Sequence, residues 1–99
     1  MPARQKTARV KIRGQHWRIV VKKLPPRRVG KDYLSMHGEC EYATRTIYLN
    51  PDFNPHRTLL HEVLHAALPD LEELTILQVE EALADSIAAL ARITQKKHD

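Results

Sequence analysis

Hydrophobic and polar residues alternate along the first half of the chain, and this period of two is typical of strands with one buried face. The alternation predicts strands over residues 9–13, 16–22 and 45–49, and a fourth strand near 36–42 would pair with 45–49. Gly14-Gln15 lies between the first two strands and predicts a tight turn. The first half therefore supplies a small sheet of three or four strands.

In the second half, apolar residues recur every three or four positions, which is the period of an amphipathic helix. One helix is expected near 55–68, with Asn54 as its N-cap and Pro55 in its first turn. A second helix is expected over about 75–95, with Thr75 and Gln78 in capping-box spacing. Its apolar stripe comprises Ile76, Val79, Leu83, Ile87, Leu90 and Thr94.

The order of these elements predicts an α+β fold, with a small antiparallel or mixed sheet packed on two helices. Residues 24–31 carry Pro and Gly punctuation and are expected to form a loop. A chain of 99 residues is long enough for one domain with a modest core. We expect a flexible basic segment over residues 1–8 and one domain over residues 9–99.

The most specific chemical pattern in the chain is His61-Glu62-x-x-His65, which falls on the first predicted helix. Positions i and i+4 lie on one helix face, so both imidazoles can reach a single metal ion, with Glu62 beside them. The apolar neighbours cover the opposite side of the helix. This spacing indicates a metal site with a base, against the alternative of two ordinary surface histidines.

A catalytic zinc site usually takes three protein ligands, so a third ligand is needed. His98 is the only histidine after His65, and it lies too close to the C-terminus to be held rigidly. Carboxylates of the second helix are better candidates. Glu80 falls near the apolar stripe, whereas Glu81 and Asp85 lie together on its flank, and the helical wheel does not choose between the two glutamates.

The two helical motifs resemble those of a known peptidase group. His61-Glu62-x-x-His65 followed by Glu81-x-x-x-Asp85 is similar to the HExxH plus ExxxD arrangement of gluzincins. In that group the ExxxD glutamate is the third zinc ligand, and the aspartate orients a ligand histidine. The resemblance implies that Glu81 is the third zinc ligand and that Asp85 orients one of the ligand histidines.

The whole plan of the chain, over about residues 10–95, is similar to minigluzincins and to small zincin-like metallopeptidases of phages and prophages. The separation of Glu81 from His65 is short for the large gluzincins. It suits a minimal member of the group and leaves Glu80 open as the third ligand. The resemblance implies a zincin-like fold and a bound Zn²⁺.

The resemblance implies hydrolysis of a peptide bond by a zinc metalloendopeptidase. Zinc would polarise the scissile carbonyl, while Glu62 would act as the general base and pass the proton to the leaving amine. Tyr48, Tyr42 and His56 are candidate donors to the transition state, and nothing selects one. The expected substrate is a protein or peptide, such as a phage or host regulator, bound as an added strand along residues 44–50. An interior strand of a small sheet is equally compatible with the pattern of these residues.

Charge is unevenly distributed along the chain, with a net +11 over residues 1–31 and −7 over residues 32–99. The basic segment suggests an alternative function, in which an inactive zincin-fold module contacts nucleic acid or protein through residues 4–31. Solvated strand edges that discourage edge pairing explain the same pattern. Trp17 is the only aromatic residue interleaved with these charges up to residue 31, and no DNA-binding motif is present.

A single cysteine, Cys40, excludes an internal disulfide and fits a reducing compartment. We expect it to be a small core or cleft residue, with zinc ligation as a minor alternative. No apolar run approaches the ~20 residues of a membrane span, and the N-terminus lacks an apolar signal segment. The sequence therefore predicts no membrane contact and a cytoplasmic location.

Overall fold

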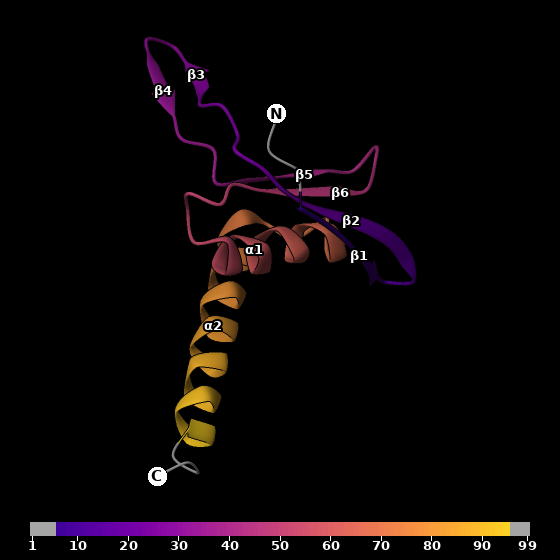
Figure 1. The fold of residues 1–99 in the computed structure, drawn as a ribbon, viewed down its shortest axis with the longest axis vertical. Helices are drawn as coiled ribbons and strands as arrows, with labels where there is room; N and C mark the ends of the chain where they lie inside the picture. Colours follow the sequence, from indigo (N-terminus) through magenta and orange to yellow (C-terminus); the bar gives the residue numbers. More distant parts are fainter. Residues whose placement is uncertain (1–5, 96–99) are drawn as a thin grey trace.

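The computed structural model describes residues 6–95, and the first five and last four residues lie outside the described part. The fold is α+β, as predicted, with a four-stranded mixed sheet, a separate two-stranded hairpin and two helices (Figure 1). The elements in chain order are β1 (Lys6–Ile12), β2 (Gln15–Val21), β3 (Arg27–Val29), β4 (Asp32–Leu34), β5 (Gly38–Glu41), β6 (Thr46–Leu49), α1 (Pro55–Ala67) and α2 (Glu73–Gln95).

The main sheet has the strand order β1-β2-β6-β5, in which β2 and β6 are parallel and the other pairs antiparallel. Strand β1 starts at Lys6, so residues 6–8 of the predicted flexible segment are paired with β2, and residues 1–5 lie outside the described residues. The turn between β1 and β2 is Arg13-Gly14, one residue earlier than predicted. Both residues have positive φ, 50° and 79°, which suits a two-residue hairpin turn.

Strand β6 pairs on both sides, with β2 and with β5. The expectation that a substrate adds as a strand along residues 44–50 is therefore wrong, because β6 has no free edge within the described sheet. Strand β5 is the edge strand on this side. Its pairing with β6 is the antiparallel one that the sequence predicted.

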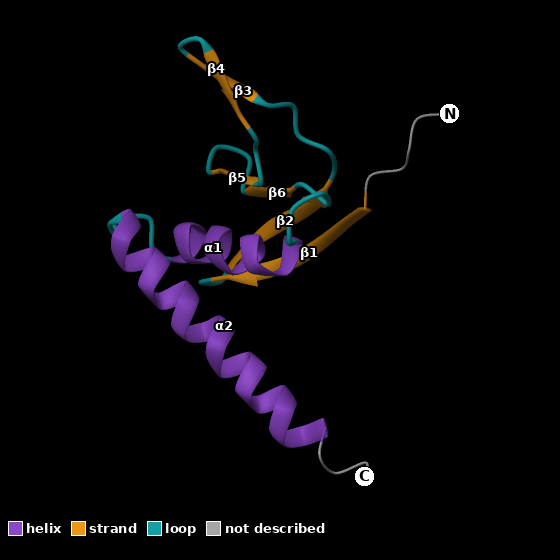
Figure 2. Cartoon of the chain, turned by 90° about the vertical axis from the view of Figure 1, so that its left-hand side faces the viewer, coloured by secondary structure: helices purple, strands orange, loops and turns teal. Residues whose placement is uncertain are grey.

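Alternation of side chains along the strands creates one face that α1 covers (Figure 2). Four buried apolar residues from β1, β2 and β6 form the core cluster on this face: Ile12, Trp17, Ile47 and Leu49. Leu59 and Val63 of α1 pack against that cluster. The core therefore fixes the position of α1 over the sheet.

Residues 24–31 do not form the simple loop that was predicted. Part of the segment forms β3, which pairs with β4 through a two-residue turn at Gly30-Lys31. All six strand residues are exposed, and the hairpin projects away from the main sheet (Figure 1). Strands of three residues are too short to produce a recognisable alternation, and Pro25-Pro26 masked their start.

Helix α1 matches the prediction closely, and the Asn54 side chain accepts a hydrogen bond from the Arg57 N–H as the N-cap. Helix α2 begins at Glu73, two residues before the predicted start, because the Glu72 carbonyl accepts a hydrogen bond from the Ile76 N–H. Neither helix within residues 6–95 has the length and apolarity that a bilayer span requires.

Candidate metal centre

Helix α1 brings the two histidines of the HExxH motif together. The Nε2 atoms of His61 and His65 lie 3.1 Å apart, and the ring centroids are separated by 4.7 Å. This proximity follows from their i, i+4 spacing, since one helical turn places them above one another. Both side chains are partly buried, which limits the competition from water.

Glu73 completes a three-residue cluster from the first turn of α2. Its Oε1 lies 2.9 Å from His61 Nε2, and its Oε2 lies 2.9 Å from His65 Nε2. The turn between the helices, with a hydrogen bond from the Leu71 N–H to the Leu68 carbonyl, folds the start of α2 back to the histidines. Two nitrogens and a carboxylate thus converge from two helices, with their ligand atoms within 4.8 Å of one another.

The donor set and its spacing fit a zinc ion. Zinc binds imidazole nitrogen and carboxylate oxygen at about 2.0–2.2 Å, so a tetrahedral site separates its ligand atoms by roughly 3.3 Å. The separations of 2.9 to 3.1 Å in this cluster require only small side-chain shifts to reach that value. Three protein ligands would leave one position open, as catalytic sites do.

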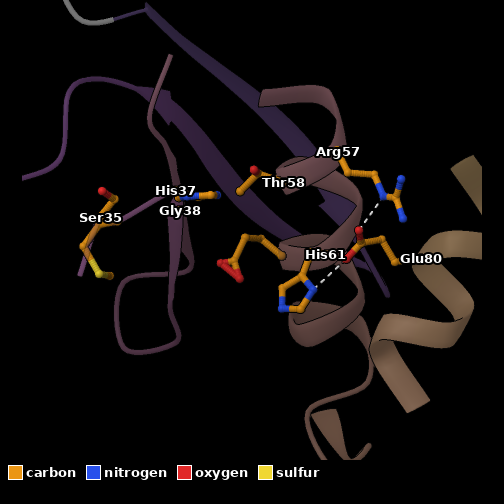
Figure 3. A pocket seen from close by; sticks show the side chains of 9 residues that line it. Ser35, His37, Gly38, Arg57, Thr58, His61 and Glu80 are labelled. Carbon is orange, nitrogen blue, oxygen red and sulfur yellow. Dashed lines mark hydrogen bonds and ion pairs between the residues drawn. The ribbon is translucent and has the colours of Figure 1, made fainter. Parts of the chain in front are cut away.

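Glu80 supports the cluster from the opposite side of the His61 ring (Figure 3). Its Oε1 lies 2.8 Å from His61 Nδ1, and its Oε2 accepts a hydrogen bond from Arg57 Nε. The Glu80 side chain is 10% exposed, so its carboxylate is largely shielded from water, whereas the Arg57 side chain is 42% exposed. A carboxylate on Nδ1 fixes the ring orientation and tautomer that present Nε2 to a metal.

Of the three ligands inferred from the sequence, the structure brings His61 and His65 together but does not bring Glu81 to them. Glu81 and Asp85 are both exposed, and neither belongs to the cluster of ligand atoms formed within residues 6–95. Glu73 and Glu80 are seven residues apart, two helical turns, so they point to the same side of α2. Glu81 is rotated by about 100° from that side.

Sequence analysis missed Glu73 because the predicted helix began at Thr75. The available signal was the acidic pair Glu72-Glu73, one residue after the break Leu68-Pro69-Asp70 that ends α1. A carboxylate in the first turn of the next helix is well placed to return to the end of the helix before it. The periodicity of α2 alone does not show how the turn between α1 and α2 orients the first residues of α2.

Glu62 is buried on the sheet side of the cluster, with 6% of its surface exposed. Burial raises its carboxyl pKa above the ordinary value, the charges of His61 and His65 oppose that shift, and Glu73 and Glu39 add to it. A carboxylate whose pKa is raised towards neutrality is better matched to accepting a proton from water at neutral pH.

A cavity of about 480 Å³ opens beside Glu62 and His61 (Figure 3). Its wall includes Gly38 of β5 and Thr58 of α1. A Cβ at Gly38 would lie 2.5 Å from Thr58 Cγ2 and 3.5 Å from Glu62 Cγ, so only glycine lets β5 approach α1 this closely. The cavity thus joins an edge strand to the candidate base.

The three candidate donors to a transition state occupy different places, and none lines this cavity. The Tyr42 hydroxyl donates to the His65 carbonyl oxygen at 2.9 Å. The Tyr48 ring packs under Lys22 Nζ at 4.7 Å, and His56 is exposed on α1. Tyr42 therefore braces the HExxH helix, and the geometry assigns no direct role to Tyr48 or His56.

Cys40 is a partly buried residue of β5 that packs against the core cluster, and it is not part of the histidine cluster. Burial raises the pKa of its thiol to about 11, the negative charge of Glu62 adds to the shift, and a hydrogen bond with Tyr42 opposes it. A thiol that stays protonated at neutral pH is a poor nucleophile and a poor ligand.

Comparison of the chain with protein-family models, with curated proteins and with solved structures found no match.

Proposed function

We propose that this protein is a zinc-dependent metalloendopeptidase with a zincin-like fold. The observation that carries the proposal is the convergence of three potential ligands, His61, His65 and Glu73, beside a buried glutamate of the same HExxH motif. A purely structural zinc site needs no such base next to its ligands. The resemblance to minigluzincins supports the same assignment, with Glu73 in place of Glu81 as the third ligand.

Zinc held by these three residues would supply Lewis-acid chemistry, polarising the scissile carbonyl and lowering the pKa of water. Glu62 would take the proton from the attacking water and deliver it to the leaving amine. Glu80 and Arg57 would hold the His61 ring, because Glu80 bridges Arg57 Nε and His61 Nδ1. Tyr42 would restrain the end of α1 through the His65 carbonyl.

A peptide substrate would bind along β5, the edge strand that borders α1 at Gly38. Edge strands offer unpaired backbone groups, so an extended peptide can add as a further strand and place a carbonyl near Glu62. The cavity beside Glu62 would take a neighbouring substrate side chain. The substrate is then an extended segment of a protein, such as a phage or host regulator.

The test is hydrolysis of denatured casein and of a quenched-fluorescence peptide library by the full-length, zinc-loaded chain, with products identified by mass spectrometry. Wild type should cleave, and Glu62→Gln should lose about 10²- to 10⁴-fold in rate while it still binds zinc. The Gln side chain preserves the size of Glu62 and removes its charge and its basicity. Equal rates for the two proteins, or no cleavage by the zinc-loaded wild type, would contradict the proposal.

A second candidate function, nucleic-acid binding, is favoured by the face of the sheet opposite α1. In the β1–β2 register Arg9 lies across from Arg18, and Lys11 lies across from His16. None of these four takes part in an ion pair within residues 6–95. Arg9 and Arg18 carry like charges directly opposite each other, which destabilises a strand pair, so this face fits a polyanion that would neutralise them.

The second function is tested by binding to duplex and single-stranded DNA over a range of salt concentration. Binding through this face predicts a steep loss of affinity with salt, and Arg9→Gln/Arg18→Gln should reduce that slope. Lys31→Gln in the distant hairpin is the matched control. Binding that is absent, or insensitive to salt, would remove this candidate and leave the peptidase proposal untouched.

A further inference from the structure

The distal half of α2, residues 83–95, extends away from the rest of the molecule (Figures 1 and 2). Among the described elements, α2 contacts only α1. The radius of gyration is 15.6 Å, whereas a compact domain of this length has about 13 Å. A helical segment of 13 residues without tertiary contacts is marginal in water, so this half needs something to pack against.

The exposed residues of this half follow the spacing of a coiled coil. The positions that face a partner in a heptad, spaced alternately by four and three, are Ile76, Glu80, Leu83, Ile87, Leu90 and Thr94. The first two are buried at the α1 corner. Leu83, Ile87 and Leu90 are 40%, 57% and 60% exposed. The seam therefore continues from a packed half into an open half.

The charges of the open half lie on the side opposite this seam. Residues 83–94 contain only two charged side chains, Asp85 and Arg92. They are seven residues apart and both occupy the outermost heptad position, farthest from a partner helix. The positions that flank the seam are Ala84, Ser86, Ala91 and Ile93. Their lack of charge removes the repulsion that would keep two identical helices apart.

We infer that the distal half of α2 is a homodimer interface, in which it packs against the same half of a second copy of this chain. A symmetric pair needs one self-complementary surface, and an uncharged heptad seam flanked by three small residues and Ile93 is such a surface. The exposed parts of Leu83, Ile87, Leu90 and Ile93, with the alanines between them, can together bury at most on the order of 1,000 Å² in a pair. That area reaches the lower limit for a specific interface.

Dimerisation through this half would leave the metal cluster accessible, because Glu73 and Glu80 lie at the other end of α2. It would also order the helix that carries both carboxylates. The inference stands apart from the proposed peptidase function, since it uses no residue of the cluster. The two can therefore fail independently.

The experiment is sedimentation analysis of the full-length protein between micromolar and millimolar concentration, alongside Leu90→Glu, Ile87→Glu and Arg92→Glu. Wild type and Arg92→Glu should approach twice the chain mass of 11.4 kDa as concentration rises. Leu90→Glu and Ile87→Glu should raise the dimer dissociation constant at least about 100-fold, since a charge would be buried in the seam.

Trp17 fluorescence during urea unfolding of the monomeric variants serves as the folding control, because Trp17 is buried in the core whereas Ile87 and Leu90 are more than half exposed. A wild type that remains monomeric at millimolar concentration would overturn the inference. So would a dimer that Arg92→Glu weakens as much as Leu90→Glu does.

Discussion

The two halves of α2 have the same apolar repeat and different surroundings. In the proximal half, Ile76 and Glu80 are buried, and Glu80 pairs with His61 of the candidate metal centre and with Arg57. In the distal half, Ile87 and Leu90 are more than half exposed. The periodicity of the sequence therefore defines which face of a helix is apolar. The turn before the helix determines which part of that face packs against the rest of the protein.

The largest expected effect that separates the two halves is on stability. Ile76→Ala removes a fully buried side chain and should lower the free energy of unfolding by about 2–5 kcal/mol. Ile87→Ala should change it by less than about 0.5 kcal/mol in dilute, monomeric protein, because that position is exposed. Urea unfolding followed by circular dichroism measures both, and similar losses for the two variants would contradict the comparison.

The next effect concerns the carboxylates along α2. Glu80→Gln should weaken zinc binding about 10- to 100-fold, since the carboxylate that orients His61 is replaced by a neutral amide. Asp85→Asn lies little more than one turn further along the same helix, on its exposed side, and should leave the affinity unchanged. Competition with a fluorescent zinc chelator measures both variants.

The comparison of Glu80→Gln with Asp85→Asn distinguishes two predictions. The structure places Glu80 on His61, whereas the resemblance to gluzincins implied that Asp85 orients the ligand histidine. A loss of affinity with Asp85→Asn and none with Glu80→Gln would mean that α2 docks with a different face. Arg57→Gln should give a smaller loss than Glu80→Gln, because Arg57 acts on the histidine only through Glu80.

The smallest effect is the pH dependence that Glu62 contributes. The pKa of Glu62 in the folded protein is raised above the ordinary value of 4.5. Protonated Glu62 therefore contributes its full stability to the fold below about pH 4.5, and this contribution is lost as the pH rises through the folded-state pKa. In the absence of metal, Glu62→Gln should match the unfolding free energy of wild type near pH 4 and exceed it at pH 7. Urea unfolding in a chelating buffer tests this.

The exposed change Glu81→Gln is the control for the pH experiment, and its effect should be small at both values. A wild type that is more stable than Glu62→Gln at pH 7 would show that the buried carboxylate is stabilised rather than penalised by its surroundings. A buried carboxylate that lowers the free energy of unfolding is an unfavourable local feature of the kind found at functional sites.

Sequence analysis predicted the elements that have a clear period. The HExxH helix and its cap, the pairing of β5 with β6 and the α+β class all followed from alternation, spacing and turn residues. The hairpin of β3 and β4 did not, because three residues are too few to establish a period. The sequence left open whether β6 is an edge strand or an interior strand, since a parallel pairing with β2 leaves no mark on either strand alone.

The candidate site was predictable where its residues share one helix and not where it joins two. His61, Glu62 and His65 occupy fixed relative positions on α1. The position of the third candidate ligand, the Glu73 carboxylate, depends on the conformation of the turn at residues 68–72 and on where α2 begins. A helix start displaced by two residues was enough to hide Glu73 from the candidates.

The most direct test of the metal centre is zinc titration calorimetry with elemental analysis on wild type, Glu73→Gln and Glu81→Gln. We expect one tightly bound zinc per chain in wild type and Glu81→Gln, and a loss of at least about 10-fold in affinity with Glu73→Gln. The absence of specific zinc binding by folded wild type, or a loss that follows Glu81 instead of Glu73, would contradict this expectation.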